Sequence, residues 1–167
     1  MKSKRLVVVG GGASGLFAAV NAARMTAGRL EVILLEKQQE LLQKVKVSGG
    51  GRCNVTHTFQ RTALFADQYA RGRNFLKKTL QHFSPEDTRL WFESRGVALK
   101  TEQDGRIFPR SDTSASIIQC LLQEASTYQV QIRMKSEVIQ ITHQANKFSI
   151  ILKQGEQIES DFLFIAT

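Results

Sequence analysis

Three glycines with the spacing Gly10-x-Gly12-x-x-Gly15 directly follow the apolar run Leu6-Val7-Val8-Val9. An alanine-rich segment comes next, and a second apolar run, Val32-Ile33-Leu34-Leu35, follows it. This order constrains the fold strongly, because a buried strand that stops at glycines and leads into a small-residue helix is typical of a βαβ unit with a tight first turn. We therefore expect two parallel strands joined by a helix within about 30 residues.

The positions within this unit match what a dinucleotide needs. Gly10 permits the tight turn, Gly12 lets the backbone approach a pyrophosphate, and Gly15 lets the helix pack closely on the strand. The first helical turn, which contains Ala13 and Ser14, presents free N–H groups and a partial positive charge to the phosphates. The sequence therefore predicts a dinucleotide site here, in preference to a glycine-rich turn of some other βαβ unit.

Glu36 ends the second apolar run, about 20 residues beyond the glycines. A carboxylate at this place accepts hydrogen bonds from ribose hydroxyls. Its charge repels a 2′-phosphate, which disfavours NADP at this site, while the neighbouring Lys37 moderates the repulsion. A secretory signal peptide is the competing interpretation of residues 1–23. We disfavour it for two reasons: four glycines would interrupt the apolar segment of the signal peptide, and Glu36 would have no explanation.

Composition excludes several classes of protein. The chain has 167 residues, of which 42% are hydrophobic and 23% charged, as expected for one globular domain with a sizeable core. No apolar run approaches the roughly 20 residues of a membrane span, so we expect a cytoplasmic protein with no membrane partner. Cys53 and Cys120 lie far apart in the sequence, and the three histidines are scattered, so we predict neither a metal site nor a redox disulfide.

The formal net charge of +8 allows two interpretations. The basic residues are most densely grouped at Arg71, Arg73, Lys77 and Lys78, and this group could bind nucleic acid or another acidic partner. The alternative is a solvated helix face together with some attraction for a pyrophosphate. We favour this alternative, because no nucleic-acid-binding motif accompanies the charge, and nucleic acid is not an expected partner.

A second glycine cluster, Ser48-Gly49-Gly50-Gly51-Arg52-Cys53-Asn54, carries further chemistry. Three glycines expose backbone N–H groups and Arg52 adds a planar cation, a combination that suits contact with phosphate or with the edge of a flavin ring. A flexible loop is the alternative interpretation.

The remaining sequence predicts helices and short strands. A helical pattern covers 73–95, with a new helix start at Ser84-Pro85, and another helix runs from Asp112 or Thr113 to about residue 126. Period-2 runs at 137–142, 147–152 and 162–166 indicate strands. The predicted fold is α/β, with a central parallel sheet, a helical insertion and an antiparallel β-meander.

Taken together, these residues resemble the FAD-dependent oxidoreductases of the aminoacetone oxidase, BaiN and YhiN type. The resemblance covers essentially the whole chain. It rests on residues 10–15, on Ser48-Gly49-Gly50-Gly51-Arg52-Cys53-Asn54-Val55-Thr56, on Glu86-Asp87-Thr88 with Trp91-Phe92-Glu93, on Gly105-Arg106-Ile107-Phe108-Pro109 with Ser111, and on residues 162–167.

The resemblance implies a Rossmann-like FAD-binding domain and flavin-mediated hydride transfer on a small-molecule substrate, with NAD(P)H as a candidate electron donor. It also implies that the three predicted strands after about Ser136 form the β-meander of such enzymes. It specifies no catalytic residue. The cofactor contacts that it implies, together with those expected from the glycine turn, are Gly10, Gly12, Ala13, Ser14, Gly15, Glu36, Lys37, Gly50, Gly51, Arg52, Cys53, Asn54, Val138, Ala166 and Thr167.

Members of this family continue beyond the terminal apolar strand into Gly-Gly and further sequence. Residues 1–167 are therefore expected to be the N-terminal part of an FAD-binding domain, without its C-terminal part and the substrate domain. Two alternatives stay open. One is a tRNA-modifying flavoprotein, because related folds serve that role and the chain is basic; the other is a non-catalytic remnant that binds FAD poorly.

Overall fold

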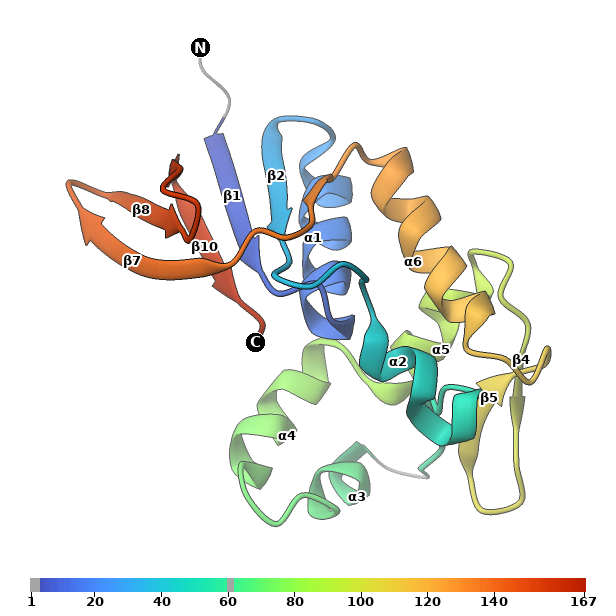
Figure 1. The fold of residues 1–167 in the computed structure, drawn as a ribbon. Coiled ribbons are helices and arrows are strands. Elements are labelled where there is room, and N and C mark those ends of the chain that lie inside the picture. The colour runs from blue at the N-terminus through green and yellow to red at the C-terminus, as the bar shows by residue number, and fades with distance from the viewer. Residues whose placement is uncertain (1–3, 60–61) are drawn as a thin grey trace. The chain divides into compact units, whose positions relative to one another are not determined.

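The structure is a computed structural model that describes residues 4–59 and 62–167 (Figure 1). The chain divides into two compact units. Unit 1 comprises residues up to 45 together with 121–167, and unit 2 comprises 46–120, so that the boundaries fall within helices α2 (Gln43–Val47) and α6 (Ala115–Thr127). No helix in the described ranges is long and apolar enough to cross a membrane.

Unit 1 is built on a parallel sheet. Its strands, in spatial order, are β10 (Phe162–Ile165), β1 (Lys4–Val9), β2 (Leu30–Leu35) and β6 (Gln131–Arg133). The continuous apolar runs of β1 and β2 are buried, as parallel strands covered on both faces require. Helix α1 (Ala13–Thr26) joins them and covers one face, with its small residues turned inward. The predicted βαβ unit is thereby confirmed.

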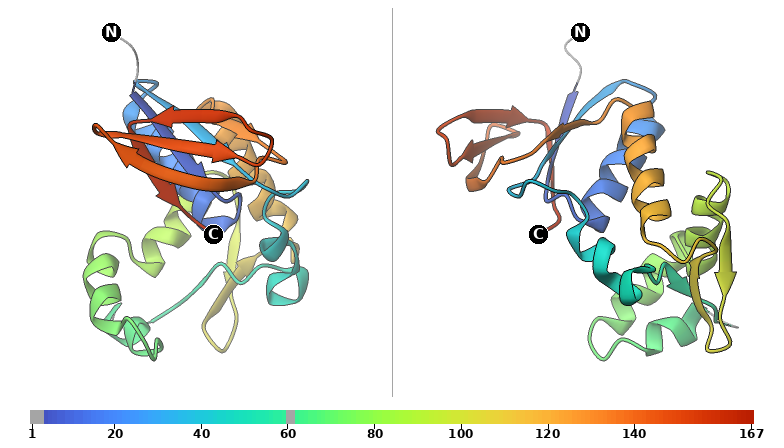
Figure 2. Two further views of the ribbon diagram at one scale, coloured as in Figure 1. Left: turned by 60° about the vertical axis from the view of Figure 1, so that its left-hand side comes forward. Right: turned by 45° about the vertical axis from the view of Figure 1, so that its right-hand side comes forward.

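The other face of the parallel sheet is covered by an antiparallel meander. Its strands are β7 (Val138–Gln144), β8 (Lys147–Leu152) and β9 (Gln157–Ser160), and in the left-hand view of Figure 2 they lie across β1. The core between the two layers is aliphatic: Val7, Val9, Ile33, Leu35, Ile150, Leu152 and Ile158. Each such side chain stabilises the fold by about 1.5–3 kcal/mol through its removal from water.

One prediction about the meander is wrong. Its third strand is β9, whereas residues 162–165 form β10, which pairs in parallel with β1 over four positions from Leu6 to Val9. The error has a physical cause. β9 contains a single apolar residue, Ile158, and therefore gives a weak strand signal, whereas the apolar run of β10 gives a strong strand signal that does not reveal its partner.

Unit 2 combines short helices with a small antiparallel sheet. The sheet has the order β3 (Thr56–His57), β5 (Arg106–Pro109) and β4 (Leu99–Thr101). The helical elements are α3 (Thr62–Asp67), α4 (Arg73–His82), α5 (Pro85–Glu93) and the 3-10 turn η1 (Ser48–Gly51). The helical pattern predicted over 73–95 is thus divided between α4 and α5. Helix α5 begins at Ser84, as predicted, with a capping box that Ser84 forms with Asp87.

Candidate functional site

The glycine turn lies where the strand order of the parallel sheet reverses. From β1 the chain proceeds to β2 and β6 on one side, and it returns as β10 on the other side of β1. Open α/β sheets bind ligands at the carboxyl ends of the strands at such a switch point. Gly10 follows β1, where its N–H donates to the Leu35 carbonyl at 2.8 Å, and Ala166 follows β10, where its N–H donates to the Val9 carbonyl at 2.8 Å.

The three predicted glycines meet different surroundings. A Cβ on Gly15 would lie 1.9 Å from the Gly10 carbonyl oxygen, so Gly15 permits the close helix–strand approach that the sequence predicts. Gly10 has φ +109°, and a Cβ there would lie 2.7 Å from the Ala166 carbonyl oxygen. Gly12, in contrast, has no described atom within 4 Å of its Cβ position. The open position is the one at which the sequence predicts a pyrophosphate.

The N-terminus of α1 faces this open position. Gly12 is the N-cap, and its carbonyl accepts the first helical hydrogen bond, from Leu16 N–H at 3.0 Å. Ala13 and Ser14 are exposed. Within the part of the chain that the structure describes, the first turn has neither an acidic side chain nor a side-chain cap. The positive end of the helix dipole is therefore available to an anion.

The Glu36 carboxylate is held in place by backbone donors. One oxygen accepts a hydrogen bond from Gly11 N–H at 2.7 Å, and the other accepts one from Gln38 N–H at 2.7 Å. An ionised carboxylate has about four acceptor positions, so capacity for ribose hydroxyls remains. A Cβ on Gly11 would lie 2.2 Å from Leu41 Cδ2. The motif spacing assigns no role to Gly11, so its close packing against Leu41 is not predicted from the sequence.

The other predicted residues of unit 1 are Ala166, Thr167, Lys37 and Val138, and only the first two are seen beside the glycine turn. Ala166 and Thr167 lie beside the glycine turn, because the Thr167 nitrogen is 3.4 Å from the Cβ position of Gly10. Lys37 is exposed and close enough to Glu137 to contribute, after Lys153, to a lowered pKa of that carboxyl. Val138 packs against the core between sheet and meander.

The second predicted loop lies in unit 2, in and after η1. Gly49, Gly50 and Gly51 all have left-handed backbone conformations, with φ +56°, +68° and +84°. Cys53 also has a positive φ, and its N–H donates to the Ser48 carbonyl at 3.0 Å, which closes the loop. The loop therefore has a defined hydrogen-bonded conformation, and it needs glycine to adopt it.

The polar residues after these glycines have distinct environments. The Arg52 guanidinium pairs with Glu102, with 2.5 Å between Nη1 and Oε1. Cys53 is buried, and burial raises the pKa of its thiol, although a hydrogen bond with Ser48 opposes the shift. Asn54 is exposed. Burial therefore favours the neutral form of the Cys53 thiol. Among the described residues, neither Cys53 nor Cys120 forms a disulfide. The described ranges contain no group of three or more His, Cys, Asp or Glu residues arranged to hold a metal ion.

Taken together, the parallel sheet with its switch point and the glycine turn at the start of α1 define a dinucleotide-binding domain of the Rossmann class. Comparison with known proteins gives the particular family. Residues 4–167 match the HI0933-like protein Rossmann domain, and the chain belongs to that family.

Curated relatives span a much longer sequence. The 3-dehydro-bile acid delta(4,6)-reductase of Clostridium scindens is 31% identical over 97% of this chain and 38% of its own length. The ribosomal RNA dihydrouridine synthase of Escherichia coli is 29% identical over 96% of this chain and 38% of its own length. The chain therefore spans about two fifths of the length of these relatives.

Solved structures share the fold at low sequence identity. The Diels-Alderase PyrE3 superposes with a TM-score of 0.55 and 16% identity, over 98% of this chain and 32% of that protein. A steroid monooxygenase, solved with NADP, has a TM-score of 0.54 and 19% identity over 99% of this chain and 26% of its own. These likenesses establish the fold class.

Proposed function

We propose that the protein binds FAD at the glycine turn and that these residues are part of a flavin-dependent oxidoreductase. The observation that carries the proposal is the open position at Gly12, at the N-terminus of α1, together with a Glu36 carboxylate oriented by the Gly11 N–H. A pyrophosphate has space at Gly12 and can accept hydrogen bonds from the N–H groups of Ala13 and Ser14.

Further contacts are proposed beyond the pyrophosphate. Glu36, with Lys37 beside it, would bind the adenosine ribose, and Gly10 and Gly15 would shape the turn around the pyrophosphate. The remaining proposed contacts are Gly50, Gly51, Cys53, Asn54, Val138, Ala166 and Thr167, with Arg52 in the same loop as the first four. When bound, FAD supplies hydride transfer, and the residues of this chain hold and orient it.

The redox activity is proposed for the whole protein, because the chain spans 38% of the length of the reductase it resembles. The name of that relative supports reduction of a small molecule. NAD(P)H as the electron donor and a cytoplasmic location are part of the proposal. Residues 1–167 would then be the N-terminal part of the FAD-binding domain.

Flavin analysis tests this proposal. The purified protein should be yellow, and heat should release FAD, identified by chromatography against FMN, in an amount close to one per chain. Added NADH or NADPH should then bleach the flavin absorbance in the absence of oxygen. A folded protein that neither retains nor takes up FAD would refute the proposal and would support the remnant interpretation.

RNA modification is a second candidate function, and two observations favour it. A relative is a ribosomal RNA dihydrouridine synthase, and the basic group at α4 is only partly neutralised. Asp67 pairs with Arg73 and Lys77, whereas Arg71 and Lys78 pair with no acid among the described residues.

Charge reversal at this group tests the second candidate. Lys78→Glu should weaken binding to ribosomal RNA several-fold and reduce its salt dependence, because a phosphate contact is lost. Lys135→Glu makes the same charge change at an exposed residue of unit 1 and serves as the control. Equal RNA affinities of the two variants would contradict RNA binding at α4.

A further inference from the structure

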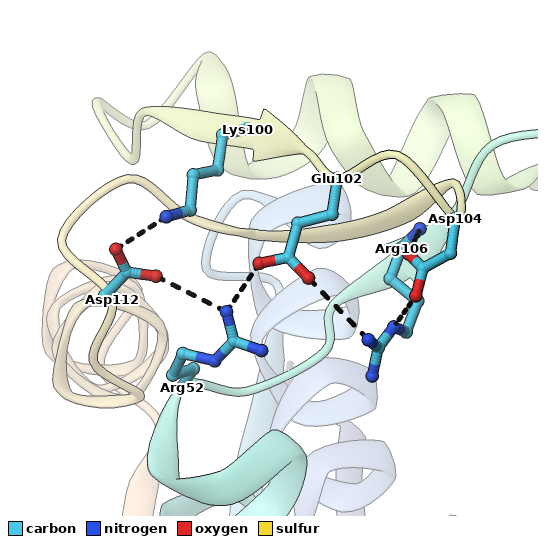
Figure 3. A network of polar contacts seen from close by, with 6 residues as sticks. All are labelled: Arg52, Lys100, Glu102, Asp104, Arg106 and Asp112. Carbon is cyan, nitrogen blue, oxygen red and sulfur yellow. Dashed lines mark hydrogen bonds and ion pairs between the residues drawn. The ribbon is translucent and has the colours of Figure 1, made fainter.

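The Arg52 guanidinium is held inside unit 2 by two carboxylates (Figure 3). Its Nη1 atom lies 2.5 Å from Glu102 Oε1 and 3.7 Å from Asp112 Oδ1. A third of the Arg52 side chain remains exposed. Both acids come from segments that flank β5, so Arg52 connects the glycine loop to the small antiparallel sheet.

The charge of Arg52 is balanced by its neighbours. The two acids that hold it are themselves paired with other cations, Asp112 with Lys100 at 2.5 Å and Glu102 with Arg106 at 3.8 Å. Arg106 in turn pairs with Asp104 at 2.6 Å. Cations and acids alternate along this network in equal number, as Figure 3 shows. A phosphate that approached Arg52 would compete with carboxylates already in contact with it.

The flat face of the guanidinium is also engaged. It lies over the Phe108 ring, 4.0 Å from the ring centroid, and Phe108 is fully buried. The same ring lies against the start of the loop, because a Cβ on Gly49 would be 2.9 Å from Phe108 Cε1. Arg52 and Gly49 therefore pack on one aromatic side chain, and that packing fixes the two ends of the glycine run relative to each other.

The middle of the loop is open. Gly50 has no described atom within 4 Å of its Cβ position, and the nearest atom to that of Gly51 is the Lys46 carbonyl oxygen at 4.0 Å. Successive N–H groups in such left-handed turns form a concave surface for an anion or a polar ring edge. The Gly51 carbonyl is occupied, since it accepts a hydrogen bond from Ser114 N–H at 2.8 Å.

We infer that Arg52 is a positioning residue: its pairing with Glu102 and Asp112 and its stacking on Phe108 hold the loop, and the backbone of Gly50 and Gly51 contacts the cofactor. This inference rests on the proposed FAD function and deepens it. The sequence alone favours the opposite role for Arg52, that of a cation directed at phosphate or flavin.

Neutral variants separate the two roles. Glu102→Gln leaves Arg52 charged and partly released. If Arg52 positions the loop, this variant should weaken FAD binding about five- to tenfold, in the same direction as Arg52→Gln, because the loop loses its support. If Arg52 contacts phosphate, Glu102→Gln should bind FAD as well as the wild type or better. Arg52→Lys should fail to restore affinity, since an ammonium group cannot reproduce the stacked, forked contacts.

A second measurement needs no FAD. Amide hydrogen exchange over residues 49–54 of the flavin-free protein should accelerate in both Arg52→Gln and Glu102→Gln. Glu93→Gln removes a carboxylate from a comparable ion pair, with Arg89 on α5, and should leave exchange and FAD affinity unchanged. Unchanged loop exchange in Glu102→Gln, or tighter FAD binding by it, would overturn the inference. Absence of FAD binding by the wild type would instead refute the proposed function.

Discussion

An added methyl group would meet different surroundings at the glycines of the α1 turn. At Gly15 it would overlap the Gly10 carbonyl oxygen, 1.9 Å away, in a part of the turn that is packed by the protein's own backbone. At Gly12 it would enter open space. The same substitution therefore distinguishes the residue that the fold needs from the residue that a ligand needs.

Gly15→Ala should destabilise the protein by about 2–4 kcal/mol, because backbone must move to admit the methyl group. Gly12→Ala should change the free energy of unfolding by less than about 1 kcal/mol, yet it should weaken FAD binding because the methyl group occupies the proposed pyrophosphate position. Urea unfolding and FAD titration measure the two effects. A Gly12→Ala protein with wild-type FAD affinity would contradict the assignment.

At the scale of single elements, helix α5 shows how a short motif fixes a boundary. The Ser84 hydroxyl accepts a hydrogen bond from Asp87 N–H at 3.1 Å, and the Asp87 carboxylate accepts one from Ser84 N–H at 2.7 Å. Ser84→Ala should lower the free energy of unfolding by about 1 kcal/mol in urea titrations. Ser126→Ala, within α6, is the control and should be close to neutral. Equal effects would show that the cap contributes nothing.

The same capping box predicts a dependence on pH. Hydrogen bonds from Ser84 to the Asp87 carboxylate lower the pKa of that carboxyl. The carboxylate therefore stabilises the fold above its unfolded pKa of about 3.9, and this contribution is lost as the pH falls through the lower folded pKa. Asp87→Asn should accordingly be less stable than the wild type at pH 7, and the difference should shrink in acid. A difference independent of pH would contradict this account.

Elements with strong local signals could be predicted from the sequence, and those fixed by tertiary context could not. The apolar runs of β1 and β2 and the cap of α5 carry their own signals. The sequence of β9 carries only a weak strand signal, because the position of this strand depends on its pairing with β8. The role of β10 depends on a parallel partner distant in sequence, so its apolar run alone did not reveal which sheet it joins.

At the scale of the whole molecule, the candidate site draws residues from separate parts of the sequence. The glycine turn, Glu36 and Ala166 converge on one end of the parallel sheet. The motif spacing predicts that Glu36 lies near the glycine turn, whereas the place of Ala166 is implied only by the family resemblance. The environment of Arg52 could not be predicted in this way. Its partners Glu102 and Asp112 lie 50 or more residues along the chain, and no local pattern connects them to the glycine loop.

Glu36 and the glycine turn are proposed to form an FAD site. Titration of FAD into flavin-free protein, wild type and Glu36→Gln, tests it most directly. The wild type should bind one FAD per chain, and Glu36→Gln should bind it about tenfold more weakly, because a charged acceptor for the ribose is lost. The glutamine amide can keep an oxygen on Gly11 N–H, but its NH2 group then faces Gln38 N–H, so the unfolding midpoint should fall somewhat while the protein stays folded. Wild-type protein that binds no FAD, or a Glu36→Gln protein that binds it equally tightly, would contradict the claim.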